Sequence, residues 1–208
     1  MGGPYSPREG NGSEHIRPKR ILAFAGRNGS GKETAAREMA RLLGGAETHT
    51  YSDILQETFK LWGFYENSRH EMQELSTFMR KLKGQDCMAK VMVNTCNLAI
   101  GNDVVIDGVR RVEDLDLLIE RFGKQNVYLI WIEVEADVRY QRLRQRKEKA
   151  GEQFMSRDLF DAQEQAESER KLIDVFAASH NVIDNNGTLG ALQYTLSVLH
   201  HDLIVGPC

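Results

Sequence analysis

The stretch from Ile21 to Thr34 (ILAFAGRNGSGKET) limits the possible folds of this chain more than any other. A short apolar run of strand length precedes a loop with three glycines, and the loop ends on Lys32. Glycines let the backbone curl so that successive N–H groups point at a polyphosphate, and a helix that begins near Glu33 adds the positive end of its dipole. Strand, loop, Gly-Lys and helix in this order indicate a phosphate-binding loop rather than an ordinary glycine-rich turn.

This loop predicts most of the residues that bind a donor nucleotide. Lys32 is expected to reach the β- and γ-phosphates as a point charge. The residue after this lysine is Glu33 instead of a hydroxyl residue, and Thr34 follows one place later. We therefore expect Thr34 to hold a metal ion through water. The predicted donor-binding residues here are Gly26, Asn28, Gly29, Ser30, Gly31, Lys32, Glu33 and Thr34.

Length and composition favour one globular domain at residues 20–208. The chain has 208 residues, of which 41% are hydrophobic, enough for a sizeable core. Residues 1–19 hold three of the four prolines and lack the apolar segment of a signal peptide, so we expect a disordered tail there. The net charge of −3 gives no general attraction to nucleic acid or to an anionic membrane, and no apolar run approaches the ~20 residues of a membrane span.

The three cysteines favour a reducing compartment, and we expect a cytoplasmic protein. Cys87 and Cys96 fall in one predicted helix, nine positions apart. Their axial separation is then about 13 Å, beyond the roughly 7 Å that a disulfide bridges. Neither a CxxC motif nor Cys/His metal spacing occurs, so a structural zinc site is not expected.

Strands and helices alternate along the chain. Strands are expected at 21–25, 48–51, 103–107, 127–134 and 181–184. The most hydrophobic of them, Val127 to Val134, is expected to be central, because buried parallel strands are apolar throughout. This alternation predicts an α/β fold in three layers, a five-stranded parallel sheet with helices on both faces and ligands at the carboxyl ends of the strands.

Acidic residues follow two of these strands. Asp107 ends the strand DVVID, and Arg110 comes shortly after it. Asp107 is expected either to orient the water shell of Mg²⁺ or to cap the following turn. Asp53 follows the second strand and is expected either to cap a helix or to face the substrate.

The segment 69–83 has two distinct faces on a helical wheel. One is an apolar stripe of Met72, Leu75, Met79 and Leu82. The other carries Arg69, Gln73, Ser76 and Arg80 within about 60° of one another, and no carboxylate interrupts it. Such a face predicts an anionic ligand, and a solvated surface with partners elsewhere in the fold is the alternative.

Several motifs match known kinases. The stretch SRHEMQELSTFMR resembles phage deoxynucleoside monophosphate kinases through Arg69, Gln73, Thr77 and Arg80, with Ser76 in place of their glycine. The run DGVRR resembles the acid and arginine segment of the same kinases and of dephospho-coenzyme A kinase-like proteins. Arg142 to Arg146 (RLRQR) resembles the arginine motif of adenylate-kinase-like lids, although a basic surface helix also fits this pattern.

The resemblance implies a P-loop kinase fold with ATP and Mg²⁺ as cofactors. It implies a helical acceptor-binding insertion at 52–101 and a short lid at 147–157. Arg142 would cover the adenine and Arg146 would hold ATP phosphates. Asn186 would lie against the adenine in the loop 185–188, which is equally a turn with Thr188 as helix cap.

The resemblance also implies the reaction, transfer of the γ-phosphoryl group of ATP to a nucleoside or deoxynucleoside monophosphate. The expected catalytic residues are Lys32, Asp107, Arg110 and Arg146, with Thr34 and Asp107 at the metal. The expected acceptor-binding residues are Asp53, Arg69, Gln73, Arg80 and Arg110. Two alternatives remain: a dephospho-coenzyme A kinase with Asp53 as base, and a nucleotide-binding regulator without turnover. The expected partner is a small nucleotide, and the protein is expected to be a monomer or homodimer.

Overall fold

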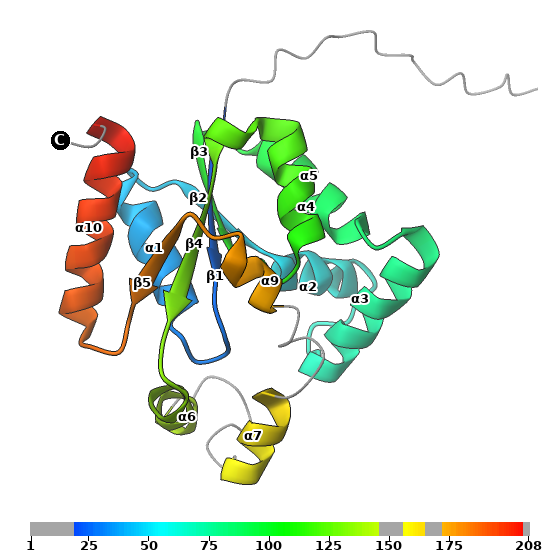
Figure 1. Cartoon of the computed structure of the whole chain (residues 1–208). Helices are drawn as coiled ribbons and strands as arrows, with labels where there is room; N and C mark the ends of the chain where they lie inside the picture. Colours follow the sequence, from blue (N-terminus) through cyan, green and yellow to red (C-terminus); the bar gives the residue numbers. More distant parts are fainter. Residues whose placement is uncertain (1–18, 146–155, 165–171, 206–208) are drawn as a thin grey trace, which may run out of the picture.

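The computed structural model describes residues 19–145, 156–164 and 172–205. Five parallel strands form one sheet in the order β2-β3-β1-β4-β5 (Figure 1). The strands are β1 (Arg20–Ala25), β2 (Glu47–Thr50), β3 (Asp103–Asp107), β4 (Val127–Glu133) and β5 (Asn181–Asp184). The predicted five-stranded parallel sheet is confirmed. β4, which was expected at the centre, lies next to it, and the middle strand is β1.

Helices cover both faces of the sheet. The described helices are α1 (Lys32–Leu42), α2 (Tyr51–Leu61), α3 (Arg69–Lys83), α4 (Cys87–Leu98), α5 (Val112–Phe122), α6 (Ala136–Gln145), α7 (Arg157–Glu164), α9 (Leu172–Ala177) and α10 (Leu189–Val205), with a short 3-10 helix at Lys124–Asn126. Helices α1 and α10 pack on one face, and α4, α5 and α9 pack on the other. None of them, within the described part of the chain, is long and apolar enough to cross a membrane.

The middle strand, β1, is apolar from Ile21 to Ala25 because both of its faces are buried. Successive side chains of a strand point to opposite faces. Ile21 and Ala23 of β1 pack in the core with α4 and α5, whereas Leu22 and Phe24 pack against α1 and α10. All four are fully buried, because both faces of the sheet are covered. The sheet therefore holds the carboxyl end of β1, where the phosphate-binding loop begins, on a rigid base.

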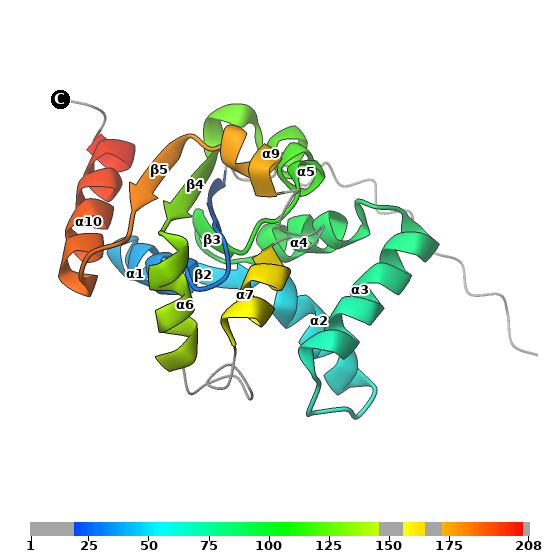
Figure 2. The same cartoon turned by 60° about the horizontal axis from the view of Figure 1, so that its bottom comes forward.

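Helices α2 and α3 project from the sheet on the side away from α10 (Figure 2). No residue of α2 is fully buried, and three residues of the predicted stripe on α3, Met72, Leu75 and Met79, are half-buried. Leu82 was expected to continue this stripe but is 59% exposed. The stripe therefore ends one turn before Gly84, which terminates the helix.

Lys19 was assigned to the disordered tail, and this boundary is wrong. Residues 1–18 lie outside the described part, but Lys19 itself is buried. Its ammonium group donates hydrogen bonds to the carbonyl oxygens of Cys96, at 2.7 Å, and Ala99. These carbonyls lie at the C-terminal end of α4, where no further helical N–H group satisfies them. Lys19 thus packs as part of the domain.

The lid and the segment after it are described only in part. The predicted lid, 147–157, lies outside the described residues apart from Ser156 and Arg157. The structure describes α7 and α9 after the lid, and residues 165–171 between them lie outside the described part.

Candidate nucleotide and acceptor site

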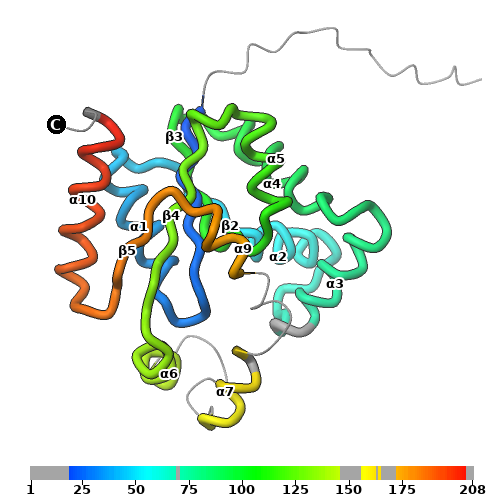
Figure 3. The backbone as a smooth tube through the Cα atoms, in the orientation of Figure 1, coloured from blue at the N-terminus to red at the C-terminus, as the bar shows by residue number. Residues whose placement is uncertain are grey.

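The phosphate-binding loop, Gly26–Gly31 (here the P-loop), connects the carboxyl end of β1 to the N-terminus of α1. It lies at the same end of the sheet as the loops that follow β4 and β5 (Figure 3). Gly26, Gly29 and Gly31 have φ angles of 152°, 79° and 85°, which residues with a side chain rarely adopt. Lys32 is the first residue of α1, one position before the helix start that was expected near Glu33.

Three different parts of the chain occupy the space that side chains at these glycines would fill. A Cβ atom on Gly26 would lie 2.7 Å from the carbonyl oxygen of Ile132 in β4. One on Gly29 would lie 2.9 Å from the carbonyl oxygen of Arg139, and one on Gly31 would lie 2.7 Å from Nδ2 of Asn185. The glycines thus allow β4, α6 and the loop after β5 to hold the P-loop in shape.

The P-loop fits a polyphosphate group. Ser30 is fully buried, and its Oγ has no hydrogen-bond partner among the described residues. Its carbonyl oxygen accepts a bond of 2.8 Å from Nδ2 of Asn185. A buried hydroxyl without a partner is costly unless a ligand satisfies it. The glycines, this hydroxyl and the start of α1 therefore form an arrangement suited to phosphate oxygens.

The residues expected to hold Mg²⁺ lie on both sides of the P-loop. Asp107 ends β3, is 8% exposed, and pairs in the sheet register with Phe24 of β1 and Thr50 of β2. Thr34 is an exposed residue in the first turn of α1. Carboxylate and hydroxyl oxygens suit Mg²⁺. The described residues contain no group of three or more acidic, His or Cys side chains that would hold a metal alone.

Glu33 makes an ion pair of 2.6 Å with Arg37, four residues along α1. The sequence placed Glu33 among the nucleotide-binding residues. The structure gives this side chain a contact on the exposed side of the helix.

The turn after β3 is attached to the strand that enters the P-loop. The backbone N–H groups of Gly108 and Val109 both donate to the carbonyl oxygen of Phe24, at 2.9 and 3.2 Å. Arg110 follows directly and is half-buried. The structure therefore places the segment from Asp107 to Arg110 beside the strand that leads into the P-loop, although this segment and the P-loop are far apart in the sequence.

Arg80 has a carboxylate partner, which the sequence analysis missed. Its Nη1 lies 3.7 Å from Oδ1 of Asp114, and the side chain of Asp114 is 3% exposed. A partner from elsewhere in the fold was the alternative considered for this basic face, but Asp114 was not named as that partner. A sequence signal existed, because Asp114 precedes Leu118 and Phe122 at four-residue spacing and so lies on the buried face of α5.

Asp53 takes part in a capping box at the start of α2. The helix begins at Tyr51 with Thr50 as N-cap, so β2 ends one residue earlier than expected. The backbone N–H of Thr50 donates to Oδ2 of Asp53 at 3.2 Å, and the N–H of Asp53 donates to Oγ1 of Thr50 at 3.0 Å. Asp53 is exposed. The capping alternative accounts for these contacts.

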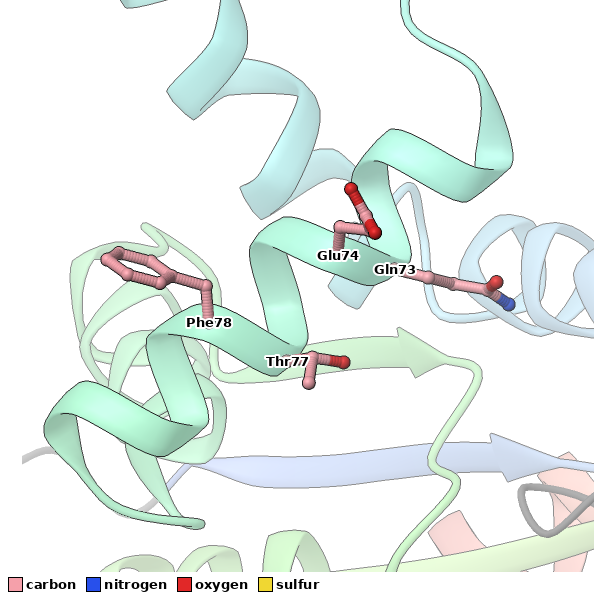
Figure 4. Close-up of a pocket in the computed structure, with 4 residues that line it drawn as sticks. All are labelled: Gln73, Glu74, Thr77 and Phe78. Atoms are coloured by element: carbon pink, nitrogen blue, oxygen red, sulfur yellow. The ribbon is translucent and has the colours of Figure 1, made fainter.

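A hollow of about 510 Å³ lies along α3, lined by Gln73, Glu74, Thr77 and Phe78. Figure 4 shows Gln73 and Thr77 projecting from one side of the helix and Phe78 from the other. Gln73 was among the predicted acceptor residues. Arg69 begins α3, but its side chain lies outside the described part of the chain.

Helix α6 contacts the loop after β5 through Arg142. Nη2 of Arg142 donates to the carbonyl oxygens of Asn185, at 2.8 Å, and Gly187, at 3.3 Å. The side-chain oxygen of Asn186 accepts a bond of 2.9 Å from the backbone of Glu135. Oγ1 of Thr188 accepts from Ala191 in the first turn of α10, so Thr188 also caps that helix. Arg146 lies outside the described residues.

A second ion-pair group was not predicted. Arg139 of α6 donates two hydrogen bonds to Glu164 of α7, at 2.8 and 2.6 Å. Arg27 of the P-loop also contacts Glu164, at 3.1 Å. Arg139 further donates to the backbone of Val134 and Asn28. The sequence offered little signal for Glu164, because it lies among many mixed charges.

Comparisons with known proteins agree with this architecture. The AAA domain family matches residues 22–171 of the chain. A UPF0200 protein of Pyrobaculum aerophilum is 31% identical over 143 residues, which cover 67% of this chain and 75% of that protein. A UPF0200 protein of Methanosarcina barkeri is 26% identical over 170 residues, covering 82% of this chain and 88% of the relative.

Solved structures show the same fold at low sequence identity. Shikimate kinase from Bacteroides thetaiotaomicron has a TM-score of 0.58 and 16% identity, and the match covers 89% of this chain and 98% of that one. A gluconokinase from Sinorhizobium meliloti has a TM-score of 0.52 and 14% identity, with coverage of 92% and 99%. The chain therefore belongs to the AAA domain family and to the UPF0200 proteins, and its fold is that of the P-loop kinases.

Proposed function

We propose that this protein transfers the γ-phosphoryl group of ATP to a nucleoside or deoxynucleoside monophosphate. One observation carries the proposal: the turn after β3 is hydrogen-bonded to Phe24, next to the P-loop. The P-loop supports binding of the donor polyphosphate. Arg110, which follows the turn, supports an anionic acceptor beside it.

A phosphate acceptor requires alignment and charge neutralisation rather than a strong base, because it is already ionised near neutral pH. Lys32 would neutralise the β- and γ-phosphates, and Arg110 would stabilise the transferring group. Arg146 is proposed for the same role from the lid. Thr34 and Asp107 would hold the water shell of a bound Mg²⁺ ion, whose chemistry here would be neutralisation of phosphate charge.

The two nucleotides would occupy opposite sides of the P-loop. On the donor side, the adenine would lie against the loop at 185–188, which contains Asn186 and is contacted by Arg142. On the acceptor side, Arg69, Gln73 and Arg80 of α3 would bind the monophosphate together with Arg110.

Dephospho-coenzyme A is the alternative acceptor. Its hydroxyl group benefits from a carboxylate base, and Asp53 was the residue considered for that role. The carboxylate of Asp53 instead accepts the N–H of Thr50 in a capping box. This contact supports a structural role for Asp53, so a phosphate acceptor is the preferred reading.

A coupled ADP-release assay tests the proposal. The acceptor panel contains all common nucleoside and deoxynucleoside monophosphates, dephospho-coenzyme A, shikimate and gluconate. We expect the highest kcat/KM with one of the monophosphates. Turnover only with a hydroxyl acceptor would overturn the acceptor class. ADP binding without turnover on any acceptor would favour the non-catalytic regulator.

A further inference from the structure

A buried acid lies next to the arginines on the acceptor side of the site. Asp114 is in the first turn of α5, and the side chain of its partner Arg80 is only 14% exposed. Nη1 of Arg80 lies 3.7 Å from Oδ1 of Asp114 and also donates to the carbonyl oxygen of Gln85. Arg80 is thus held between a carboxylate and a backbone carbonyl, in one orientation.

Gln85 extends this contact to a second arginine. Its side-chain oxygen accepts a hydrogen bond of 2.8 Å from Nη1 of Arg111. Arg111 adjoins Arg110 in the turn after β3, and it directly precedes α5. The C-terminal part of α3 and the turn beside the P-loop are therefore joined through Arg80, Gln85 and Arg111.

The charges around Asp114 come from several elements. Arg80 approaches from α3, Arg111 from the segment before α5, and Glu113 is its neighbour on α5. Tyr51 of α2 also faces this group, and its hydroxyl is buried without a hydrogen-bond partner among the described residues. Burial raises the pKa of Asp114 to about 6, and the two arginines oppose that rise. Asp114 is therefore mostly ionised at neutral pH.

We propose that Asp114 is a positioning residue of the acceptor site. Its carboxylate fixes Arg80, and through Gln85 also Arg111, in the orientation that receives the phosphate of the acceptor. Asp114 is too deeply buried to touch the acceptor itself. This inference rests on the proposed function, because it assigns a supporting residue to the same site.

Three variants test the role of this carboxylate. Asp114→Asn keeps the shape of the side chain and removes its charge, whereas Asp114→Glu keeps the charge. Asp116→Asn is the matched control, since Asp116 is an exposed acid on the same helix. With ATP and the best monophosphate of the panel, Asp114→Asn should raise the acceptor KM by roughly tenfold or more through lost alignment of charge-assisted bonds. The KM for ATP should stay within about twofold. Asp114→Glu should restore part of the acceptor affinity, and Asp116→Asn should behave as wild type.

The pH profile separates positioning from simple structural support. In the wild type, the acceptor KM should rise as pH falls through about 6, because protonated Asp114 no longer holds Arg80. The acceptor phosphate titrates in the same range, so the profile of Asp114→Asn serves as the reference. The acceptor KM of the wild type should rise more steeply as pH falls than titration of the acceptor phosphate alone would cause. This extra rise should be absent in Asp114→Asn, whose acceptor KM at pH 7.5 should already be high.

Thermal unfolding provides the second readout. Because burial favours the neutral form of Asp114, Asp114→Asn should keep the wild-type melting temperature at pH 7 or exceed it. A lower melting temperature together with a parallel loss of both substrate affinities would overturn the positioning role. An unchanged acceptor KM in Asp114→Asn would overturn this inference alone. Failure of the wild type to phosphorylate any monophosphate would overturn the proposed function and the inference with it.

Discussion

At the scale of single residues, the P-loop depends on the absence of side chains at three positions. A Cβ atom at Gly26 or Gly31 would come within 2.7 Å of an atom from another element. Both glycines also have positive φ angles. Any larger residue would therefore displace β4 or Asn185 and strain the backbone. These close neighbours hold the P-loop, with Lys32 at its end, in its conformation in the absence of a nucleotide.

The first prediction concerns Lys32, whose proposed role is to neutralise the β- and γ-phosphates. Lys32→Ala should fold normally and lower kcat by roughly 10²-fold or more, the scale of a lost electrostatic contact to a transition state. Steady-state kinetics with the best acceptor measures the effect. Lys124→Ala is the control, since Lys124 is an exposed lysine before β4. A loss within about tenfold, or ~1.4 kcal/mol, would contradict the assigned role.

The second prediction separates the capping and base roles of Asp53. If Asp53 only caps α2, Asp53→Asn should lower kcat modestly, whereas removal of a general base costs about 10²- to 10⁴-fold. Thr50→Ala removes the other half of the capping box. We expect it to destabilise the fold by about 1 kcal/mol, measured by urea unfolding. A collapse of kcat in Asp53→Asn with a normal rate in Thr50→Ala would favour a hydroxyl acceptor.

At the scale of elements, the C-terminal end of α4 is bound by a lysine that directly precedes β1. The amine of Lys19 donates to two carbonyl oxygens at the end of α4, and the next residue starts β1. One side chain thus connects the first strand to a helix on the face of the sheet. The composition of the N-terminal segment did not predict the contact between Lys19 and the end of α4. This contact forms because the end of α4 lies beside the start of β1 in the fold.

Replacement of Lys19 tests this contact. Lys19→Met keeps the length of the side chain but leaves the carbonyls of Cys96 and Ala99 without their buried donor. A buried acceptor that loses its partner costs about 1–3 kcal/mol. The free energy of unfolding, measured with urea, should fall by that amount, whereas Lys124→Met should leave it unchanged. Equal stability in the two variants would show that the contact contributes nothing.

At the scale of the whole molecule, ion pairs connect segments that are distant in the sequence. Glu164 of α7 contacts Arg27 in the P-loop, 137 residues away, and Arg139 of α6. Its side chain is 16% exposed. Partial burial raises the pKa of Glu164, but the bonds from Arg139 and Arg27 outweigh this effect and lower it below the ordinary value of 4.5. The fold is therefore more stable when Glu164 is ionised.

Glu164→Gln should reduce this stability in a pH-dependent way. A lowered folded-state pKa contributes stability above the unfolded value of 4.5, and this contribution disappears as pH falls through the folded value. The melting temperature of Glu164→Gln should thus lie below that of the wild type at pH 7, and the gap should narrow in the acid range below 4.5. Thermal unfolding at both pH values measures it. Glu120→Gln, an exposed acid on α5, is the control. A gap that widens in acid would contradict the assignment.

Much of the fold followed from patterns that are local in the sequence. The P-loop, each apolar strand and the apolar stripe of α3 are all encoded in a short run of residues. The interactions that favour each of them act between residues close in the sequence. Glycines at fixed positions indicated the loop, and unbroken apolar runs indicated buried parallel strands. The alternation of these elements was enough to predict a parallel sheet with helices on both faces.

The partners of individual charges were decided only by the tertiary structure. The residues around Arg80 in the sequence do not predict its contact with Asp114. Those around Arg27 do not predict its contact with Glu164. Likewise, the sequence allowed Asp53 to be either a helix cap or a residue that faces the substrate. The structure shows its hydrogen bond with Thr50 at the start of α2. Which partner a charged side chain contacts depends on which segments pack together in the core. It also depends on how deeply the two side chains are buried. The sequence by itself determined the glycine-rich P-loop, because its causes are local, and the packing of α3 against α5 decided which acid lies beside Arg80.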